Sequence, residues 1–447
     1  MKKIFFYLSC VLLLFSCSEN NLDENINTRE NSCNPSANVQ LSLNQAVAYA
    51  NIFSQRFKEL EEQGNKRLET RSSTSKKLSI KNVDFIVEGI DTLLYVINFS
   101  NDNGYMLLSG ANSSFPVIAH SSTGNLYLKD IDKANPLYMV VESYKNKIKK
   151  ELSNPSLTSN EYFEEWKDLG KKGYEYEIEP NNTEPKPATR TRRKDSTGKK
   201  TIYPYTGKQL DYWCQEGGYN FYAQNQYPIG CPAIATGMLM YDTSQRILGN
   251  SQTTFPLFNL TDTIDVKDIN KGTSVAKKLR LITDSIPEYN FTPEFSGALP
   301  DNITIGLHKL GYTKAEKVPY NFELLYKNLT FKGYDYFGQE TDYQRGILLA
   351  AYQSAWGGGH IWFCDGYYEQ AYTIKKKFLG IRIKSWEEYD DRIYMNWGWG
   401  HDKGNGWYCA TDSQWSSLDK ENINLNYETF MYINLNHYEI PIHKNNH

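Results

Sequence analysis

Between residues 40 and 120, the hydrophobic pattern changes from helical spacing to short strand-like runs. Ser42 and Gln45 form a capping box, which marks the start of a helix. The apolar face of that helix consists of residues three or four positions apart, namely Ala46, Ala50, Phe53, Phe57 and Leu60. The strand-like runs that follow occupy residues 83–87, 93–99, 105–109 and 117–119. The pattern predicts a small α+β domain, in which His120 ends an apolar strand and has a packing or surface role.

A second helical pattern begins at Cys231. Ile234, Met238 and Tyr241 recur at helical spacing, and Pro232 is tolerated only in the first turn of a helix. Cys231 is therefore predicted at a helix N-terminus, where the helix dipole and the unpaired N–H groups favour a thiolate. A buried structural cysteine is the alternative, because free cysteines are commonly buried.

Two further strand-like runs carry polar side chains at their ends. His360 follows three glycines and starts one run, while Asn396 ends another and precedes Trp397. A thiol nucleophile needs a base, and an asparagine carbonyl could orient an imidazole for that task. Taken singly, the three residues are explained as a core histidine, a turn residue and a core aromatic. The combination with Cys231 favours nucleophilic catalysis.

The N-terminus has the plan of a secretory signal. Two lysines precede the apolar residues 4–15, which Ser9 alone interrupts. This run is too short for a membrane-spanning helix. It ends in Leu14-Phe15-Ser16-Cys17, which resembles a bacterial lipobox and predicts lipidation of Cys17. An ordinary signal peptide with an incidental cysteine is the alternative; both predict export, and lipidation would anchor the precursor to the outer membrane or cell surface.

The composition excludes some classes of function and divides the chain into two halves. The 447 residues include 49 Lys+Arg against 52 Asp+Glu, so the basic footprint of a nucleic-acid-binding protein is missing. Seven cysteines are too few for a disulfide scaffold. Eight of the nine tryptophans lie at or beyond Trp213, and residues 179–200 before them are rich in proline and polar residues. This stretch is predicted to be an exposed linker, cut by proteolysis or merely solvated. Its basic cluster consists of Arg190, Arg192, Arg193 and Lys194.

Several motifs together resemble the streptopain family of papain-like cysteine peptidases. They are Gly230-Cys231, Gly358-Gly359-His360 with Asp365-Gly366, Asn396-Trp397-Gly398-Trp399-Gly400, and the propeptide-like run at residues 103–110. The resemblance implies an exported zymogen of class α+β. Its parts would be a signal peptide (1–16), a tether (17–38), an inhibitory propeptide domain (39–178), a cleavable linker (179–200) and a catalytic domain (201–447). The catalytic domain would have a helical lobe and an antiparallel β lobe.

The resemblance also assigns roles to individual residues. Cys231 would be the nucleophile and His360 the general base, then acid. Asn396 would orient His360, and Trp397 would shield that pair. Gln215 would complete the oxyanion hole with the Cys231 N–H. Gln224 and Gln226 lie nearer in the sequence and are the alternatives, while the substrate-pocket candidates are Gly358, Gly359 and Trp399.

No metal or organic cofactor is implied. The expected partners are protein or peptide substrates, the chain's own propeptide and an activating protease, with the membrane reached only through the lipid anchor. Residues 367–390 exceed the family's usual loop and predict an extra hairpin at the rim. His401 replaces the family's usual glycine and is a second candidate base, with nothing nearby expected to orient it.

Other functions fit parts of the pattern. A structural zinc site is one alternative, and its ligands would be Cys231, His360, Cys364 and Cys409. A transglutaminase-like acyl transferase would share the Cys/His chemistry, and a surface-binding lipoprotein would need no chemistry at all. Cys214, Cys364 and Cys409 are otherwise predicted to be packed thiols.

Overall fold

A computed structural model describes most of both halves of the chain. The described residues are 40–65, 78–112, 116–131, 133, 135–153, 164–180, 201–202, 210–247, 274–334, 340–353, 358–410 and 427–435. The signal segment, the predicted lipidation site Cys17 and the basic cluster of the linker lie outside them.

The N-terminal domain is built as its hydrophobic pattern predicts. Its elements are α1 (Leu43–Asn65), β1 (Ile80–Glu88), β2 (Asp91–Phe99), β3 (Tyr105–Ser109), β4 (Val117–Ser121), the short η2 (Leu128–Asp130), α2 (Pro136–Ser153) and β5 (Tyr174–Pro180). The capping box forms: the Ser42 N–H donates to Gln45 Oε1 at 3.0 Å, and the Gln45 N–H donates to Ser42 Oγ at 3.3 Å. Strands β1 to β4 are antiparallel neighbours in sequence order.

Strand β2 is covered on both faces, which explains its continuous apolar run. Leu94 and Val96 belong to the same core as α2. Tyr95 and Ile97 point the other way, into a second core with α1. Because neighbouring side chains of a strand alternate between faces, a strand between two helices is apolar at every position.

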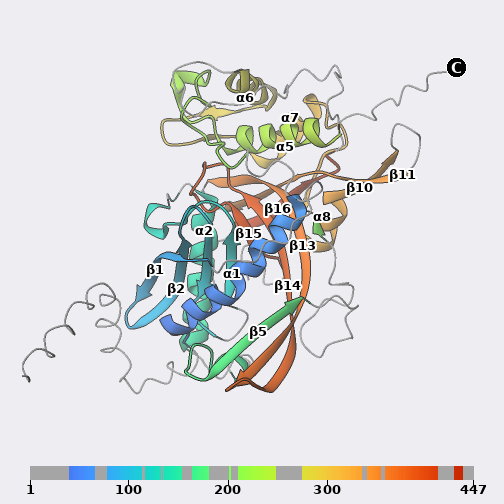
Figure 1. Ribbon diagram of the computed structural model, residues 1–447. Coiled ribbons are helices and arrows are strands. Elements are labelled where there is room, and N and C mark those ends of the chain that lie inside the picture. Colours follow the sequence, from blue (N-terminus) through green and yellow to red (C-terminus); the bar gives the residue numbers. More distant parts are fainter. Residues whose placement is uncertain are drawn as a thin grey trace, which may run out of the picture.

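The C-terminal half contributes the remaining elements. They are β6 (Thr201–Ile202), η4 (Gln224–Gln226), α5 (Cys231–Ile247), α6 (Ser274–Ser285), β7 (Asn290–Phe291), β8 (Ser296–Gly297), α7 (Pro300–Lys309), β9 (Glu316–Pro319), α8 (Phe322–Leu329), β10 (Thr330–Tyr334), β11 (Glu340–Gln344), β12 (Ile347–Gln353), β13 (Gly359–Phe378), β14 (Ile381–Asn396), β15 (Gly406–Cys409) and β16 (Tyr427–Ile433). Helices α5, α6 and α7 gather above the strands (Figure 1). The predicted α+β class, with a helical lobe and an antiparallel β lobe, is confirmed.

One antiparallel sheet of 12 strands runs through both halves. The halves join where β4 pairs with β15, with His120 opposite Trp407 and Ala119 opposite Tyr408. Strands β13 and β14 form a long hairpin, so residues 367–390 lie in a hairpin as predicted; that they exceed the family's loop and lie at the rim stays a prediction. Figure 1 shows this hairpin extending away from the helical lobe, with β5 alongside it. No helix among the described residues is both long and apolar enough to cross a membrane.

Candidate active site

The turn before α5 presents Cys231 at the first position of that helix. Gly230 has φ of +92°, a region that favours glycine. A Cβ at Gly230 would lie 2.3 Å from Tyr289 Oη and 2.4 Å from the Ser296 carbonyl oxygen, so a side chain would not fit. The predicted helix start is therefore confirmed, and backbone geometry and crowding both require the glycine before it.

The Cys231 thiol faces the strand that carries His360. Backbone N–H groups of Ile361 and of Cys231 itself contact the sulfur and lower its pKa, but burial dominates and raises the pKa of the thiol to about 11. Only 8% of Cys231 is exposed. The expectation of a thiolate is therefore wrong for this form of the protein, because burial outweighs the helix N-terminus. The neutral thiol lies beside the residue that directly follows His360.

His360 is the second residue of β13, one position after the strand begins, and lies opposite Ala351 of β12. The glycines before it differ in their surroundings. A Cβ at Gly359 would lie 2.0 Å from the Tyr352 ring, whereas a Cβ at Gly358 would meet nothing within 4 Å. Gly359 is thus required by close packing, and Gly358 borders open space. His360 itself is partly exposed.

Asn396 ends β14 and lies opposite Phe363 of β13. Its Oδ1 accepts a hydrogen bond from the Gly398 N–H at 3.1 Å, and its buried Nδ2 has no hydrogen-bond partner among the described residues. Trp397 is fully buried; its Nε1 donates to the Gly404 carbonyl at 2.9 Å. These contacts fix both residues to the following loop. That Asn396 orients His360 and that Trp397 shields the pair stay predictions.

The other pocket candidate of this motif, Trp399, is partly buried and packs against the main core. Within the part of the chain that the structure describes, its Nε1 lacks a hydrogen-bond partner. A role for Trp399 in substrate binding stays a prediction.

The three candidate glutamines differ in their relation to the Cys231 turn. The Gln215 carbonyl accepts a hydrogen bond from the Ile229 N–H at 2.8 Å, and Gln215 is buried. Gln224 and Gln226 are exposed. Of the three, Gln215 is tied by its backbone to the turn that precedes Cys231, which favours it as the oxyanion-hole donor.

Sequence reasoning missed Tyr289. Its hydroxyl donates to the Ile229 carbonyl at 2.6 Å and lies where a side chain of Gly230 would be. Burial raises the pKa of Tyr289, the nearby Cys231 adds to that rise, and the Ala233 N–H opposes it by donating to the phenol oxygen. The hydroxyl therefore caps α5 from outside, in place of a cap that Gly230 cannot supply. The chain has 34 tyrosines, and no feature of the sequence distinguishes Tyr289 from the other 33.

The four residues of the alternative zinc site are not brought together. Across the described part of the chain, the one group of three potential ligands within 4.8 Å of one another is Asp102, His401 and Asp402. The described cysteines, namely Cys214, Cys231, Cys364 and Cys409, are free thiols. Cys231 and Cys364 are buried, whereas Cys214 and Cys409 are only partly so.

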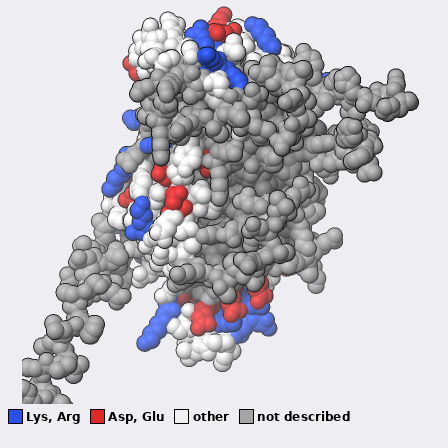
Figure 2. Space-filling view, turned by 45° about the horizontal axis from the view of Figure 1, so that its top comes forward, with Lys and Arg blue, Asp and Glu red and all other residues white. Residues whose placement is uncertain are grey.

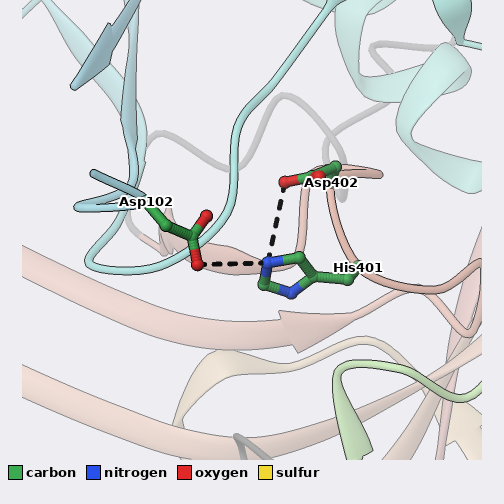
Figure 3. Close-up of side chains that lie close together, drawn as sticks. All are labelled: Asp102, His401 and Asp402. Atoms are coloured by element: carbon green, nitrogen blue, oxygen red, sulfur yellow. Dashed lines mark ion pairs between the residues drawn. The ribbon is translucent and has the colours of Figure 1, made fainter. Parts of the chain in front are cut away.

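His401 contacts carboxylates of both halves. Its Nε2 lies 3.5 Å from Asp102 Oδ2 and 3.7 Å from Asp402 Oδ1 (Figure 3). The ring also stacks on Tyr212, with centroids 4.7 Å apart. The expectation that nothing orients His401 is therefore wrong. Since Asp102 lies in the N-terminal domain, the contact joins that domain to the loop after the Asn396–Gly400 motif.

A buried arginine makes the firmest contact between the halves. Arg392 of β14 donates from Nη1 to the Ile118 carbonyl at 2.9 Å and from Nη2 to the Val117 carbonyl at 2.7 Å. Its Nε donates to Asp390 Oδ1 at 2.6 Å, and Arg392 is fully buried. The N-terminal domain is thus held against the strand that ends at Asn396.

The N-terminal domain is similar to a known family. Residues 39–148 match the family model described as Spi protease inhibitor. The match confirms the resemblance to streptopain-like zymogens through their propeptide. No curated protein matches the chain. A solved structure of a prointerpain A fragment from Prevotella intermedia shares 16% identity with a TM-score of 0.44, covering 79% of this chain and 98% of that one.

Proposed function

We propose that the chain is a latent cysteine endopeptidase whose nucleophile is Cys231. The observation that carries this proposal is the contact between the Cys231 sulfur and the backbone of Ile361, because it puts the thiol next to the start of the His360 strand. A protease-inhibitor domain in the same chain supports a peptidase as its target.

In the proposed reaction, His360 removes the thiol proton and the Cys231 sulfur attacks the carbonyl carbon of a peptide bond. The tetrahedral oxyanion accepts hydrogen bonds from the Cys231 N–H and the Gln215 side chain. Such a donor contributes about 10²–10³ in rate in other enzymes. His360 then gives its proton to the departing amine, and a thioester remains. Water, deprotonated by His360, hydrolyses the thioester and restores the thiol.

Tyr289 supports this arrangement through the turn that carries the nucleophile. Its hydroxyl satisfies the Ile229 carbonyl and the Ala233 N–H, which flank Cys231 on either side. These two contacts hold the turn that presents Cys231.

Activation would require cutting the linker. Strand β5 ends at Pro180 opposite Tyr372, and β6 begins at Thr201 opposite Tyr368. Residues 181–200 thus connect two points four positions apart on β13, a span of about 13 Å at ~3.3 Å per strand residue. The linker is far longer than this span requires, so cutting it would not by itself disturb either strand. We propose cleavage at its basic cluster, after which the inhibitor domain can leave.

The lipid anchor would leave with the inhibitor domain. If Cys17 is lipidated, the precursor is held at the bacterial surface, and cleavage releases the peptidase domain. This part of the proposal is tested by membrane partitioning before and after cleavage. Equal partitioning of both forms would contradict release.

The central test replaces Cys231. In the cleaved protein, Cys231→Ala should abolish hydrolysis of a fluorogenic peptide, and His360→Ala should reduce it about as strongly, since the two groups act as a unit. Cys364→Ala is the matched control, because Cys364 is also a buried free thiol but lies in the interior of β13. Substantial hydrolysis by Cys231→Ala would sink the proposal.

A further inference from the structure

The outer half of the β13–β14 hairpin has an unusual partner. Strand β5 pairs with β13 from Tyr174 opposite Phe378 to Pro180 opposite Tyr372. Strand β5 belongs to the N-terminal half of the chain, up to residue 180, which we call the inhibitor half because its residues 39–148 match the inhibitor family model. Within this half, the Tyr176 hydroxyl donates to the Glu165 carbonyl at 2.9 Å, and Arg56 Nη2 donates to the Ile178 carbonyl at 3.1 Å. Removal of that half would therefore leave this edge of β13 without its strand partner.

The two strands are complementary in charge. Lys375 Nζ lies 2.6 Å from Glu179 Oε1, and Lys377 pairs with Glu177. On the other face of β13, Lys376 Nζ lies 2.6 Å from Asp168 Oδ2 with only 6% of its side chain exposed. Figure 2 shows basic and acidic atoms intermixed at the lower end of the molecule, where the hairpin lies in Figure 1. All three lysines are neutralised by carboxylates of the inhibitor half.

The sequence of β5 alternates to match this edge. Its acidic positions are Glu175, Glu177 and Glu179, and its apolar positions between them are Tyr174, Tyr176 and Ile178. Tyr176 and Ile178 are buried in the core that also holds Tyr372 and Ile374 of β13. This edge of β13 therefore accommodates an extended segment in which acidic and apolar residues alternate.

The tip of the hairpin adds uncovered apolar surface. Leu379, Ile381 and Ile383 are 73%, 71% and 54% exposed even while β5 is in place. A soluble protein seldom exposes neighbouring large apolar side chains unless they contact a partner.

We propose that, after activation, the β13 edge at residues 372–378 is a substrate-docking site that binds an extended acidic segment of a protein substrate. The site rests on the proposed function, because it opens only when the inhibitor half leaves. The segment would add a strand to β13 in the position of β5, with backbone hydrogen bonds giving affinity and the lysines selecting carboxylates. An anionic membrane would meet the charge and the apolar tip, but it offers no backbone to pair with the strand edge.

Direct binding tests the site without requiring activity. The chain carrying Cys231→Ala is cut in the linker, the inhibitor half is removed, and the remaining peptidase half is mixed with a labelled peptide of residues 174–180. We expect saturable binding that weakens at least fivefold when the three glutamates of the peptide are glutamine. Equal binding of both peptides, or binding of neither while phosphatidylglycerol vesicles are bound, would overturn the proposal.

Kinetics of the activated enzyme give the second measurement. In Lys375→Gln/Lys377→Gln, KM for a protein substrate with an acidic extended segment should rise about fivefold to tenfold, as expected from the loss of two surface ion pairs. Its kcat, and all constants for a short peptide, should stay unchanged. Lys309→Gln/Lys327→Gln is the matched control, since both lysines are exposed and lie on α7 and α8. An unchanged KM would overturn docking alone, whereas an inactive parent enzyme would overturn the proposed function.

Discussion

Among the contacts between the inhibitor half and the rest of the chain, the β4–β15 and β5–β13 junctions differ in the burial of their charged side chains. At the β4–β15 junction, Arg392 is fully buried and holds two backbone carbonyls of β4, while His120 is 2% exposed. At the β5–β13 junction, Lys375 and Lys377 pair with carboxylates that are about half exposed. The first junction places a buried arginine against backbone carbonyls, whereas the second carries two of its ion pairs on a face that water reaches.

This difference in burial suggests that one junction stabilises the latent form and that the other affects how readily the inhibitor half is released. Removing one partner of a buried ion pair leaves the other charge buried and uncompensated, which destabilises the fold. Exposed ion pairs contribute little to the free energy of unfolding and are screened by salt. We therefore expect the β4–β15 junction to hold the latent form together. The two exposed ion pairs of the β5–β13 junction, Lys375–Glu179 and Lys377–Glu177, should oppose release of the inhibitor half only weakly once the linker is cut.

The largest effect is expected at Arg392. Arg392→Met keeps much of the side-chain volume but leaves Asp390 buried without its cation, so the free energy of unfolding of the intact chain should fall by about 3–5 kcal/mol. Urea unfolding measures this change. Arg280→Met, which breaks an exposed pair with Asp284 on α6, is the control and should shift stability by less than about 0.5 kcal/mol. Equal effects of the two variants would show that the buried junction is not special.

A pH dependence is expected from His120. Burial, with Arg392 nearby, holds the pKa of His120 well below its ordinary value. The unfolded chain therefore binds a proton near pH 6.5 that the folded chain does not, so stability is fully present above this pH and falls below it, by up to about 1.4 kcal/mol per pH unit. His120→Gln should remove this slope, while His308→Gln should keep it. A slope that survives in His120→Gln would refute the assignment.

Removing an exposed ion pair at the β5–β13 junction should change the global stability of the intact chain only slightly. Glu177→Gln removes the partner of Lys377. We expect the urea midpoint of the intact chain to stay the same, whereas amide exchange in β5 becomes faster. High salt should produce the same acceleration in the parent protein, because it screens exposed charges. A large loss of global stability would place this junction in the same class as Arg392.

The smallest effect is expected at the third contact between the halves. Asp102 lies 3.5 Å from His401, and its side chain is 55% exposed. Asp102→Asn should therefore change the free energy of unfolding by no more than about 0.5 kcal/mol. Thermal unfolding at neutral pH is sufficient to measure it. A change of several kcal/mol would mean that this surface contact is a principal latch.

Local chemistry made much of the site predictable from the sequence. Pro232 marked the start of α5 at Cys231, because proline fits only the first turn of a helix. The glycines before His360 and the tryptophan after Asn396 marked the strand ends that the structure has. Such patterns depend on a few neighbouring residues, so the sequence displays them.

Features that depend on distant parts of the chain were not predictable. Tyr289 lies 60 residues from Ile229, whose carbonyl it binds, and the pairing of Lys375 with Glu179 spans 196 residues. The state of the Cys231 thiol was predicted wrongly because its pKa depends on burial by the assembled fold. His401 was misjudged for the same reason, since Asp102 reaches it from the other half.

The most direct test of Cys231 as a latent nucleophile is its rate of alkylation at pH 7, followed by mass spectrometry before and after the linker is cut. Burial raises the pKa of the Cys231 thiol to about 11, so the thiolate is a minor form at pH 7 in the intact chain. We expect slow labelling before the cut and rapid labelling after it, together with the onset of peptide hydrolysis. Rapid labelling of the intact chain, or hydrolysis that persists once Cys231 is fully alkylated, would contradict a latent Cys231 nucleophile.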